Sequence, residues 1–327
     1  MKEWLYIAKG ITIILVVIGH FSSTSMPNYF IEIKKIIYTF HMPLFFILSG
    51  FLYSYSKYSF KELVILKVRR LVFPFISVSL IFFIVKYIGA FFVHIKTEVT
   101  FQSFIALLIN PLHSYVPLLW FVYALFFIFI IYHLSRTLIS NEFILFLLFF
   151  IIALLVNIAP TNSIVDKIFL NIPFFISGII AQKFILDKPS SRIVVVIFYI
   201  VMYICIFIID FGVFSYFKIF ILGLLGAFSI IVLSQIISRF NKIARVFIKI
   251  GIYSMSIYLL HPIFLNIPKI FLEQIIGINN FEIIFIFSII AGIIFPYNIE
   301  IYFIRKYNLL RKYILGINEV KTKDVRK

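Results

Sequence analysis

The residues of this sequence best suited to proton transfer are histidines in apolar surroundings. His20 ends the apolar stretch KGITIILVVIGH, which starts at Lys9, and His41 and His261 also lie within long apolar runs. An imidazole titrates near neutral pH and can act as a base or as a nucleophile. Ionisable groups in apolar spans usually face a bundle interior or a water-filled cavity. We therefore expect the three histidines to share one polar site, in which His20 is catalytic and the other two either assist it or only link helices.

Lys9 and His20 lie on one face of any helix that contains both. Eleven residue steps separate them, which brings the helix back to within roughly 20° of its starting direction and covers about 16 Å. A cation and an imidazole on a common face could line a path through the protein, and we expect Lys9 to belong to the catalytic site. The alternative is that Lys9 only anchors the helix by extending its ammonium to the membrane surface.

These residues must be held by membrane-spanning helices, because the composition leaves too little polar surface for a soluble domain. Of the 327 residues, 63% are hydrophobic and 13% are charged, and the mean hydropathy is +1.12. Apolar runs of about 20 residues, the length that crosses a bilayer, recur along the chain. We predict an all-α polytopic membrane protein with about ten transmembrane helices, at 4–22, 36–56, 71–93, 118–134, 143–159, 168–186, 192–210, 217–237, 250–270 and 281–303.

The net charge of +17 is explained by membrane topology rather than by a nucleic-acid partner. With a cytoplasmic N-terminus, 23 of the 30 Lys and Arg residues fall on the cytoplasmic side and six fall outside, as the positive-inside rule expects. Both termini are therefore predicted to be cytoplasmic. We expect residues 1–303 to form a single transmembrane domain and residues 304–327 to form a basic tail that contacts anionic lipids. We predict no metal site.

A basic cluster follows the second predicted span. Lys67, Arg69 and Arg70 fall on the cytoplasmic side of this topology. Arginine binds phosphate through two parallel hydrogen bonds and lysine binds it as a point charge, so the cluster can hold a phosphate-bearing molecule. The same residues would also fix the orientation of the chain in the membrane, and the sequence does not separate these two roles.

Six segments resemble, in order, motifs of the membrane-bound acyltransferase-3 family, and among its members the polysaccharide and fucose O-acetylase-like group is the most similar. The first is the stretch from a basic residue to a histidine that opens this section. Each segment is short, but the ordered set covers most of the chain. The six are KGITIILVVIGH (9–20), FHMPLFFILSGFLYS (40–54), KVRRLVFP (67–74), LWFVYALFF (119–127), NIPFFISGIIA (171–181) and IGIYSMSIYLLHP (250–262).

The resemblance implies an O-acyltransferase of a bacterial inner membrane. Its donor would be acetyl-CoA or another acyl-CoA, bound from the cytoplasm as a substrate rather than a resident cofactor. Its acceptor would be a hydroxyl of a cell-envelope glycan or a lipid-linked sugar, with polysaccharide biosynthesis proteins as possible partners. By position, His20 matches the essential histidine of the family, Lys9 its paired basic residue, and Lys67 with Arg70 the donor-binding cations. Many relatives carry an aspartate where this chain has Tyr6.

Two functions of other classes remain open at this stage. One is a transporter or flippase of glycan intermediates, and the other is a noncatalytic membrane component of a polysaccharide export system. Transporters coupled to ion gradients usually carry carboxylates inside their spans. Here only Asp210 and Glu300 come close, and both lie near the ends of predicted spans. This distribution favours an enzyme over a transporter.

Overall fold

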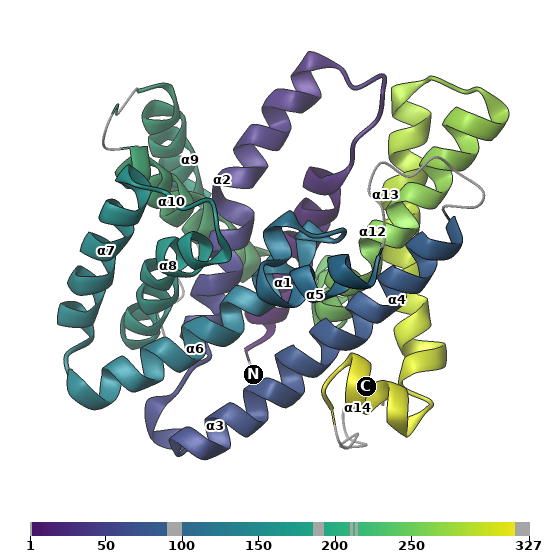
Figure 1. The fold of residues 1–327 in the computed structure, drawn as a ribbon. Helices are drawn as coiled ribbons and strands as arrows, with labels where there is room; N and C mark the ends of the chain where they lie inside the picture. Colours follow the sequence, from purple (N-terminus) through teal and green to yellow (C-terminus); the bar gives the residue numbers. More distant parts are fainter. Residues whose placement is uncertain (1, 90–99, 186–192, 210–211, 213–214, 318–327) are drawn as a thin grey trace.

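Helices make up the regular structure of this protein in a computed structural model that describes residues 2–89, 100–185, 193–209, 212 and 215–317 (Figure 1). No β-strand occurs within these ranges.

Long apolar runs with few glycines favour helices, and side-chain caps fix several of their starts. Ser59 and Glu62 form a reciprocal capping box at the start of α3. The α-helices are α1 Glu3–His20, α2 Asn28–Phe51, α3 Phe60–Lys67, α4 Phe73–Gly89, α5 Phe101–Ile109, α6 Trp120–Leu138, α7 Glu142–Ile158, α8 Ile164–Ile185, α9 Ile193–Ile208, α10 Ser215–Ile237, α11 Asn241–Ile252, α12 Ser254–Ile270, α13 Phe281–Ile299 and α14 Asn308–Ile314.

Seven helical segments within the described residues are long and apolar enough to cross a membrane: Glu3–His20, Phe60–Gly89, Pro117–Leu138, Ile164–Lys183, Ser215–Ile237, Ser254–Ile276 and Phe281–Ile304. The other three predicted spans correspond to α2, α7 and α9. Helices α7 and α9 are apolar but shorter than these seven, and the first half of α2 carries Glu32, Lys34 and Lys35. The all-helical, multi-pass architecture is thus established, whereas the number of ten spans and the side on which the termini lie stay predictions.

The two ends of the helix bundle carry different predicted site residues. Figure 1 places α3 and α14 at the bottom of the view, the start of α1 above them in the lower half, and the end of α1 with the start of α2 toward the top. We call the end with α3 the inner end and the opposite end the outer end, following the predicted orientation. On this basis the predicted basic cluster lies at the inner end and His20 lies toward the outer end.

Close helix contacts at glycines hold the bundle together. Helices α2 and α8 meet at Gly50 and Gly178, where a Cβ atom on either glycine would collide with a carbonyl group of the other helix. Helix α1 meets α11 in the same way at Gly10 and Gly251. Small residues at such contacts let two backbones approach closely, which is how helices pack without a hydrophobic drive in lipid. These contacts fix the rotation of α1 and α2, the helices that carry His20 and His41.

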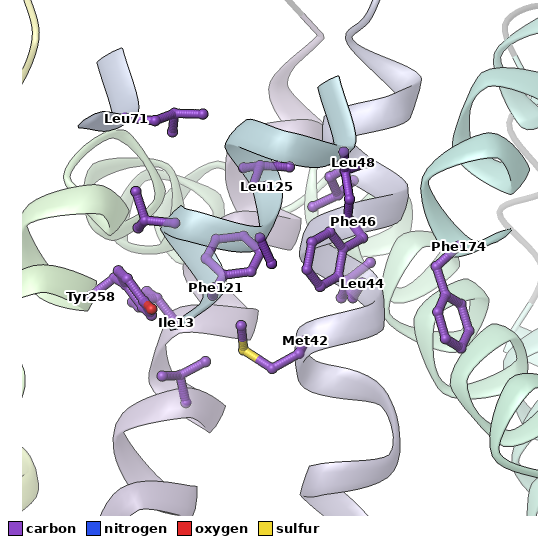
Figure 2. Packing of buried hydrophobic residues seen from close by; sticks show 14 of the residues in the cluster. Ile13, Met42, Leu44, Phe46, Leu48, Leu71, Phe121, Leu125, Phe174 and Tyr258 are labelled. Atoms are coloured by element: carbon purple, nitrogen blue, oxygen red, sulfur yellow. The ribbon is translucent and has the colours of Figure 1, made fainter. Parts of the chain in front are cut away.

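A layer of buried apolar side chains fills the middle of the bundle (Figure 2). Ile13 of α1, Met42 and Phe46 of α2, Phe121 of α6 and Tyr258 of α12 point toward one another there. All five are less than a tenth exposed. Three of these helices, α1, α2 and α6, also border the outer cavity described below, so the core fixes how they meet around it.

Candidate active site

The structure brings the three predicted histidines together although they lie far apart in the sequence. The His20 ring stacks on the His261 ring with 5.3 Å between ring centroids and 24° between ring planes. The His41 ring lies edge-on to His20, with 6.1 Å between centroids. His41 and His261 are buried. Helices α1, α2 and α12 therefore place three imidazoles around one point near the outer end of α1.

The hydrogen bonds of His261 determine which nitrogen of His20 is free. Nδ1 of His261 lies 3.0 Å from the carbonyl oxygen of Ile257 and 2.8 Å from that of Tyr258. Because carbonyl oxygens only accept hydrogen bonds, this Nδ1 carries the proton, and Nε2 of a neutral His261 is an acceptor. That Nε2 lies 3.2 Å from Nδ1 of His20. His20 therefore donates from Nδ1, and its Nε2 keeps an unshared lone pair.

His41 is oriented by its own helix in a similar manner. Its Nδ1 donates to the carbonyl oxygen of Ile37 at 2.7 Å, so its Nε2 is also a potential acceptor. The Tyr38 ring lies beside both imidazoles, 5.2 Å from His41 and 6.1 Å from His20 between centroids. The Tyr38 hydroxyl donates to the Gly19 carbonyl oxygen at 2.7 Å. These contacts join the end of α1 to α2 beside His20.

His20 and His41 face a cavity of about 560 Å³ at the outer end, whereas His261 lies behind His20 and is not part of its lining. The cavity is large enough for a ligand of the size of a sugar ring with neighbouring groups. None of the described residues that line it is acidic. Its lining combines imidazole, amide, hydroxyl, ammonium and aromatic groups with aliphatic ones, and the polar and aromatic members are His20, Tyr38, Thr39, His41, Trp120, Asn157, Lys167, Asn171, Phe174 and Tyr216.

Most of the lining residues were not among the predicted site residues, and four of these are Trp120, Asn157, Lys167 and Asn171. Asn157 donates to Ser215 at 2.9 Å, and Asn171 donates to the Lys167 carbonyl oxygen at 2.7 Å, so each amide group is held in place by a neighbour. The Lys167 ammonium lies 5.8 Å from the centroid of the Trp120 ring. The signal that could have found the two asparagines is their occurrence inside apolar runs, where an amide side chain usually has a partner or a ligand.

The structure places Lys9 outside this cavity. Lys9 lies in the inner half of α1, and the buried side chains of Ile13, Val16 and Val17 separate it from His20 along the helix. None of the ion pairs among the described residues involves Lys9. Where many relatives carry an aspartate, the backbone of Tyr6 packs against Gly251 of α11. No carboxylate thus takes over the missing aspartate's role toward Lys9 in the described part of the chain.

The predicted basic cluster lies at the inner end, apart from the histidines. Lys67 ends α3, and its ammonium lies 3.1 Å from the centroid of the Phe129 ring of α6. Arg69 and Arg70 lie in the π-helical turn Val68–Val72 that joins α3 to α4. The backbone of both arginines is contacted by Gly316, which follows α14 and has a φ of +66°. A left-handed φ favours glycine, and a side chain there would press on the arginine backbone.

Helix α6 gives the separation between the two ends of the site. Trp120 lines the outer cavity and Phe129 contacts Lys67. Trp120 and Phe129 are nine residues apart, which corresponds to about 14 Å along the helix axis. The buried residues Phe121, Leu125 and Ile128 fill this interval. The cations and the histidines therefore occupy opposite sides of one packed apolar layer.

Comparison with known proteins places this arrangement in a family. The model of an acyltransferase domain, that of the acyltransferase-3 family, matches residues 2–300, nearly the whole chain. This chain belongs to the acyltransferase-3 family. No curated protein and no solved structure matches the chain. Family membership and the seven membrane-crossing segments together make the protein a multi-pass membrane acyltransferase.

For an acyltransferase-3 protein, the geometry around His20 supplies what acyl transfer needs. An acceptor must lose a proton as it attacks, and the His20 ring borders a cavity of sufficient size for such a molecule. The partner at Nδ1 holds the ring in one tautomer, as the third member of a nucleophile–base–orienter set does in other acyltransferring enzymes. Family membership also favours this class over a transporter or a noncatalytic export component.

Proposed function

We propose that this acyltransferase moves an acetyl group from acetyl-CoA to a hydroxyl of a cell-envelope polysaccharide or of a lipid-linked sugar in a bacterial inner membrane. The observation that carries the proposal is the orientation of His20, whose Nδ1 is engaged by His261 and whose ring borders a cavity of about 560 Å³. A cavity of this size with an aromatic ring and two amides suits a sugar, which offers both hydroxyls and an apolar ring face.

In the proposed reaction His20 is the general base. The acceptor hydroxyl gives its proton to Nε2 of His20 while its oxygen attacks the thioester carbonyl carbon. The carbon–sulfur bond then breaks, and the leaving CoA thiolate takes the proton back from Nε2, so the atoms and charges balance. The same nitrogen could instead attack the thioester and carry the acyl group as an acyl-imidazole before passing it to the acceptor.

His261 and His41 have supporting roles in this proposal. When His20 takes a proton it becomes an imidazolium, and its hydrogen bond to Nε2 of His261 becomes charge-assisted and stronger. His261 is thus a positioning residue that stabilises the charge formed in the transition state. His41, with its Nε2 free and its ring edge-on to His20, borders the same cavity and is placed to accept a hydrogen bond from the acceptor sugar.

The donor is proposed to bind at the inner end. Lys67, Arg69 and Arg70 would hold the CoA phosphates, with Lys9 nearer the acyl end of the donor. The acyl group would reach His20 through the packed layer that Phe121 helps to form, which requires side chains there to move apart. Support for this route comes from the position of Lys67 and Lys9 on the inner side of that layer.

The test is acyl transfer by purified protein with radiolabelled acetyl-CoA and an envelope glycan fraction. His20→Ala is expected to reduce transfer per correctly inserted molecule by about 100-fold or more, the usual loss when an acid–base group is removed. His113→Ala is the matched control, because His113 is exposed and its side chain bonds only the Asn162 carbonyl oxygen among the described residues. Near-normal turnover of His20→Ala would refute the proposed role of the imidazole.

A further inference from the structure

A second cavity of about 530 Å³ opens between α4 and α12, outside the proposed acyl-transfer site. Its wall includes Val85 and Ile267, which are 43% and 53% exposed on the outside of the bundle. In a membrane protein, apolar side chains exposed in this way contact lipid tails. The cavity is therefore a lateral groove that the hydrocarbon of the bilayer can enter. We call it the α4–α12 groove; it is lined by Phe82, Val85, Lys86, Gly89, Tyr115, Val116, Pro117, Leu118, Pro262, Ile263, Asn266, Ile267, Lys269, Ile270 and Gln274.

The α4–α12 groove is apolar at depth and cationic at its outer end. Phe82 lies four residues before Lys86 on α4, and Ile263 lies six residues before Lys269 on α12. Both helices run from the inner to the outer end, so the two ammonium groups start roughly 6 and 9 Å farther out than these apolar residues. None of the described lining residues is acidic. This gradient matches an amphiphile with an anionic head and a hydrocarbon chain.

Apolar packing does not explain why a lysine, Lys86, lies in this groove. It lies in an apolar helix, where an ammonium is costly unless it pairs with an acceptor or serves a ligand. Its Nζ donates to the Tyr115 carbonyl oxygen at 2.5 Å, and none of the ion pairs among the described residues includes it. An ammonium has three protons to donate. Lys86 therefore has donors to spare for an anion in the groove.

The groove adjoins the cavity that holds His20. Pro117 and Leu118 line both spaces, so the short segment they form is the wall between them. Tyr258 fixes this wall by donating its hydroxyl proton to the Leu118 carbonyl oxygen. An amphiphile held in the groove would thus have its head group beside the catalytic cavity.

A further lysine, Lys34, lies near both the α4–α12 groove and the cavity that holds His20. The Lys34 ammonium donates to the carbonyl oxygen of Phe21, the residue after His20, at 2.8 Å. Lys34 is close enough to interact electrostatically with both His20 and Lys269. Positive charge thus continues from the groove to the mouth of the cavity that holds His20.

We infer that the α4–α12 groove binds the hydrocarbon chain and phosphate of a lipid-linked sugar, with Lys86 and Lys269 on the phosphate and the sugar extending past Leu118 to His20. The inference rests on the proposed function for the fate of the sugar, and it selects the lipid-linked form among the proposed acceptors. An ordinary phospholipid shares the phosphate and the hydrocarbon, but it has no sugar to occupy the adjacent cavity with its amides and Trp120.

A binding experiment tests the groove without acyl transfer. Native mass spectrometry of the purified protein would compare farnesyl phosphate, farnesol and phosphatidylglycerol as added lipids. The double variant Lys86→Gln, Lys269→Gln is expected to bind farnesyl phosphate about tenfold or more weakly than wild type, as expected for lost charge-assisted hydrogen bonds. Glutamine at position 86 keeps a donor for the Tyr115 carbonyl oxygen, and farnesol binding should be equally weak in both proteins.

Lys35→Gln is the matched control, because Lys35 is also an outer lysine but is exposed and paired with Glu32 at 2.7 Å. Its binding of farnesyl phosphate should equal that of wild type. Equal binding by the double variant and wild type would overturn the inference. So would displacement of a sugar linked through phosphate to a farnesyl chain by an equal concentration of phosphatidylglycerol, which would mark the groove as a site for ordinary membrane lipid only.

A kinetic experiment then links the groove to the reaction. The same sugar would be offered either linked through phosphate to a farnesyl chain or as a free glycan. Wild type should show the lower KM for the lipid-linked form. The double variant should raise that KM about tenfold and leave kcat within twofold; an unchanged KM would refute the link. If wild type acylates neither acceptor, the proposed function fails. The binding experiment still decides whether the groove binds a lipid phosphate.

Discussion

Replacing His261 tests the proposed mechanism more sharply than replacing His20, because His261 does not line the cavity and touches the reaction only through the His20 ring. His261→Leu removes the imidazole acceptor beside Nδ1 of His20, leaves the backbone hydrogen bond of the His20 ring to Val16, and roughly keeps the side-chain volume. A hydrogen bond to a charged group contributes about 1.5–3 kcal/mol. Because the bond to neutral His20 already contributes about 0.5–1.5 kcal/mol, protonation of the ring adds about 1–1.5 kcal/mol, and kcat should fall about tenfold.

Glutamine at the same position should restore part of this loss. Its amide oxygen can reach the place of Nε2 and accept the proton of His20 Nδ1, so His261→Gln should be at least fivefold faster than His261→Leu. The assay is acetyl transfer to the glycan acceptor at saturating and limiting acceptor concentrations, with thermal unfolding of each variant as the control for folding. Because the interaction is with the charged ring, KM for the acceptor should change less than twofold. Equal activity of the leucine and glutamine variants, or a loss confined to KM, would refute the positioning role.

Three further predictions follow from other parts of the fold. Gly50→Leu should lower the thermal unfolding temperature in detergent by several degrees, because overpacking at a backbone contact costs about 1–3 kcal/mol; an unchanged temperature would contradict the α2–α8 contact. Replacing Arg69 and Arg70 with glutamine should raise the KM for acetyl-CoA about tenfold with kcat nearly unchanged, and inverted insertion with normal donor affinity would make these residues topological only. Cysteines introduced at Ser25 and Tyr58 in a Cys205→Ser background should react with impermeant reagents from outside and from the cytoplasm respectively, and the reverse pattern would overturn the orientation.

The sequence was sufficient to predict the helical class and the gathering of His20, His41 and His261, because each lies toward the same end of a predicted span. It could not predict that His261 lies behind His20 rather than beside the cavity. The position of His261 depends on how α12 is rotated against α1. This rotation is set by contacts between residues far apart in the chain. The same limit applies to Asn157 and Asn171, whose directions depend on the packing of α7 and α8.

The sequence was a weaker guide to the number of spans and to the inner end. Hydrophobic runs predict ten spans, but the charged first turns of α2 and the short α7 and α9 leave seven segments that are both long and apolar. The π-helical turn at Val68–Val72 and its contact with Gly316 have no sequence pattern that would indicate them. The contact brings the segment after α14, late in the chain, against a turn early in the chain.

The apolar layer between the two ends of the site has a consequence for the energy balance of the cell. A bacterial plasma membrane stores energy as a proton gradient, and a chain of water passing three histidines would conduct protons along that gradient. Ile13, Phe46 and Phe121 present only hydrocarbon to such a chain in the middle of the described bundle. With the donor bound on one face and the acceptor on the other, as proposed, the enzyme would not discharge the gradient, provided that the layer closes tightly around the pantetheine arm of the donor.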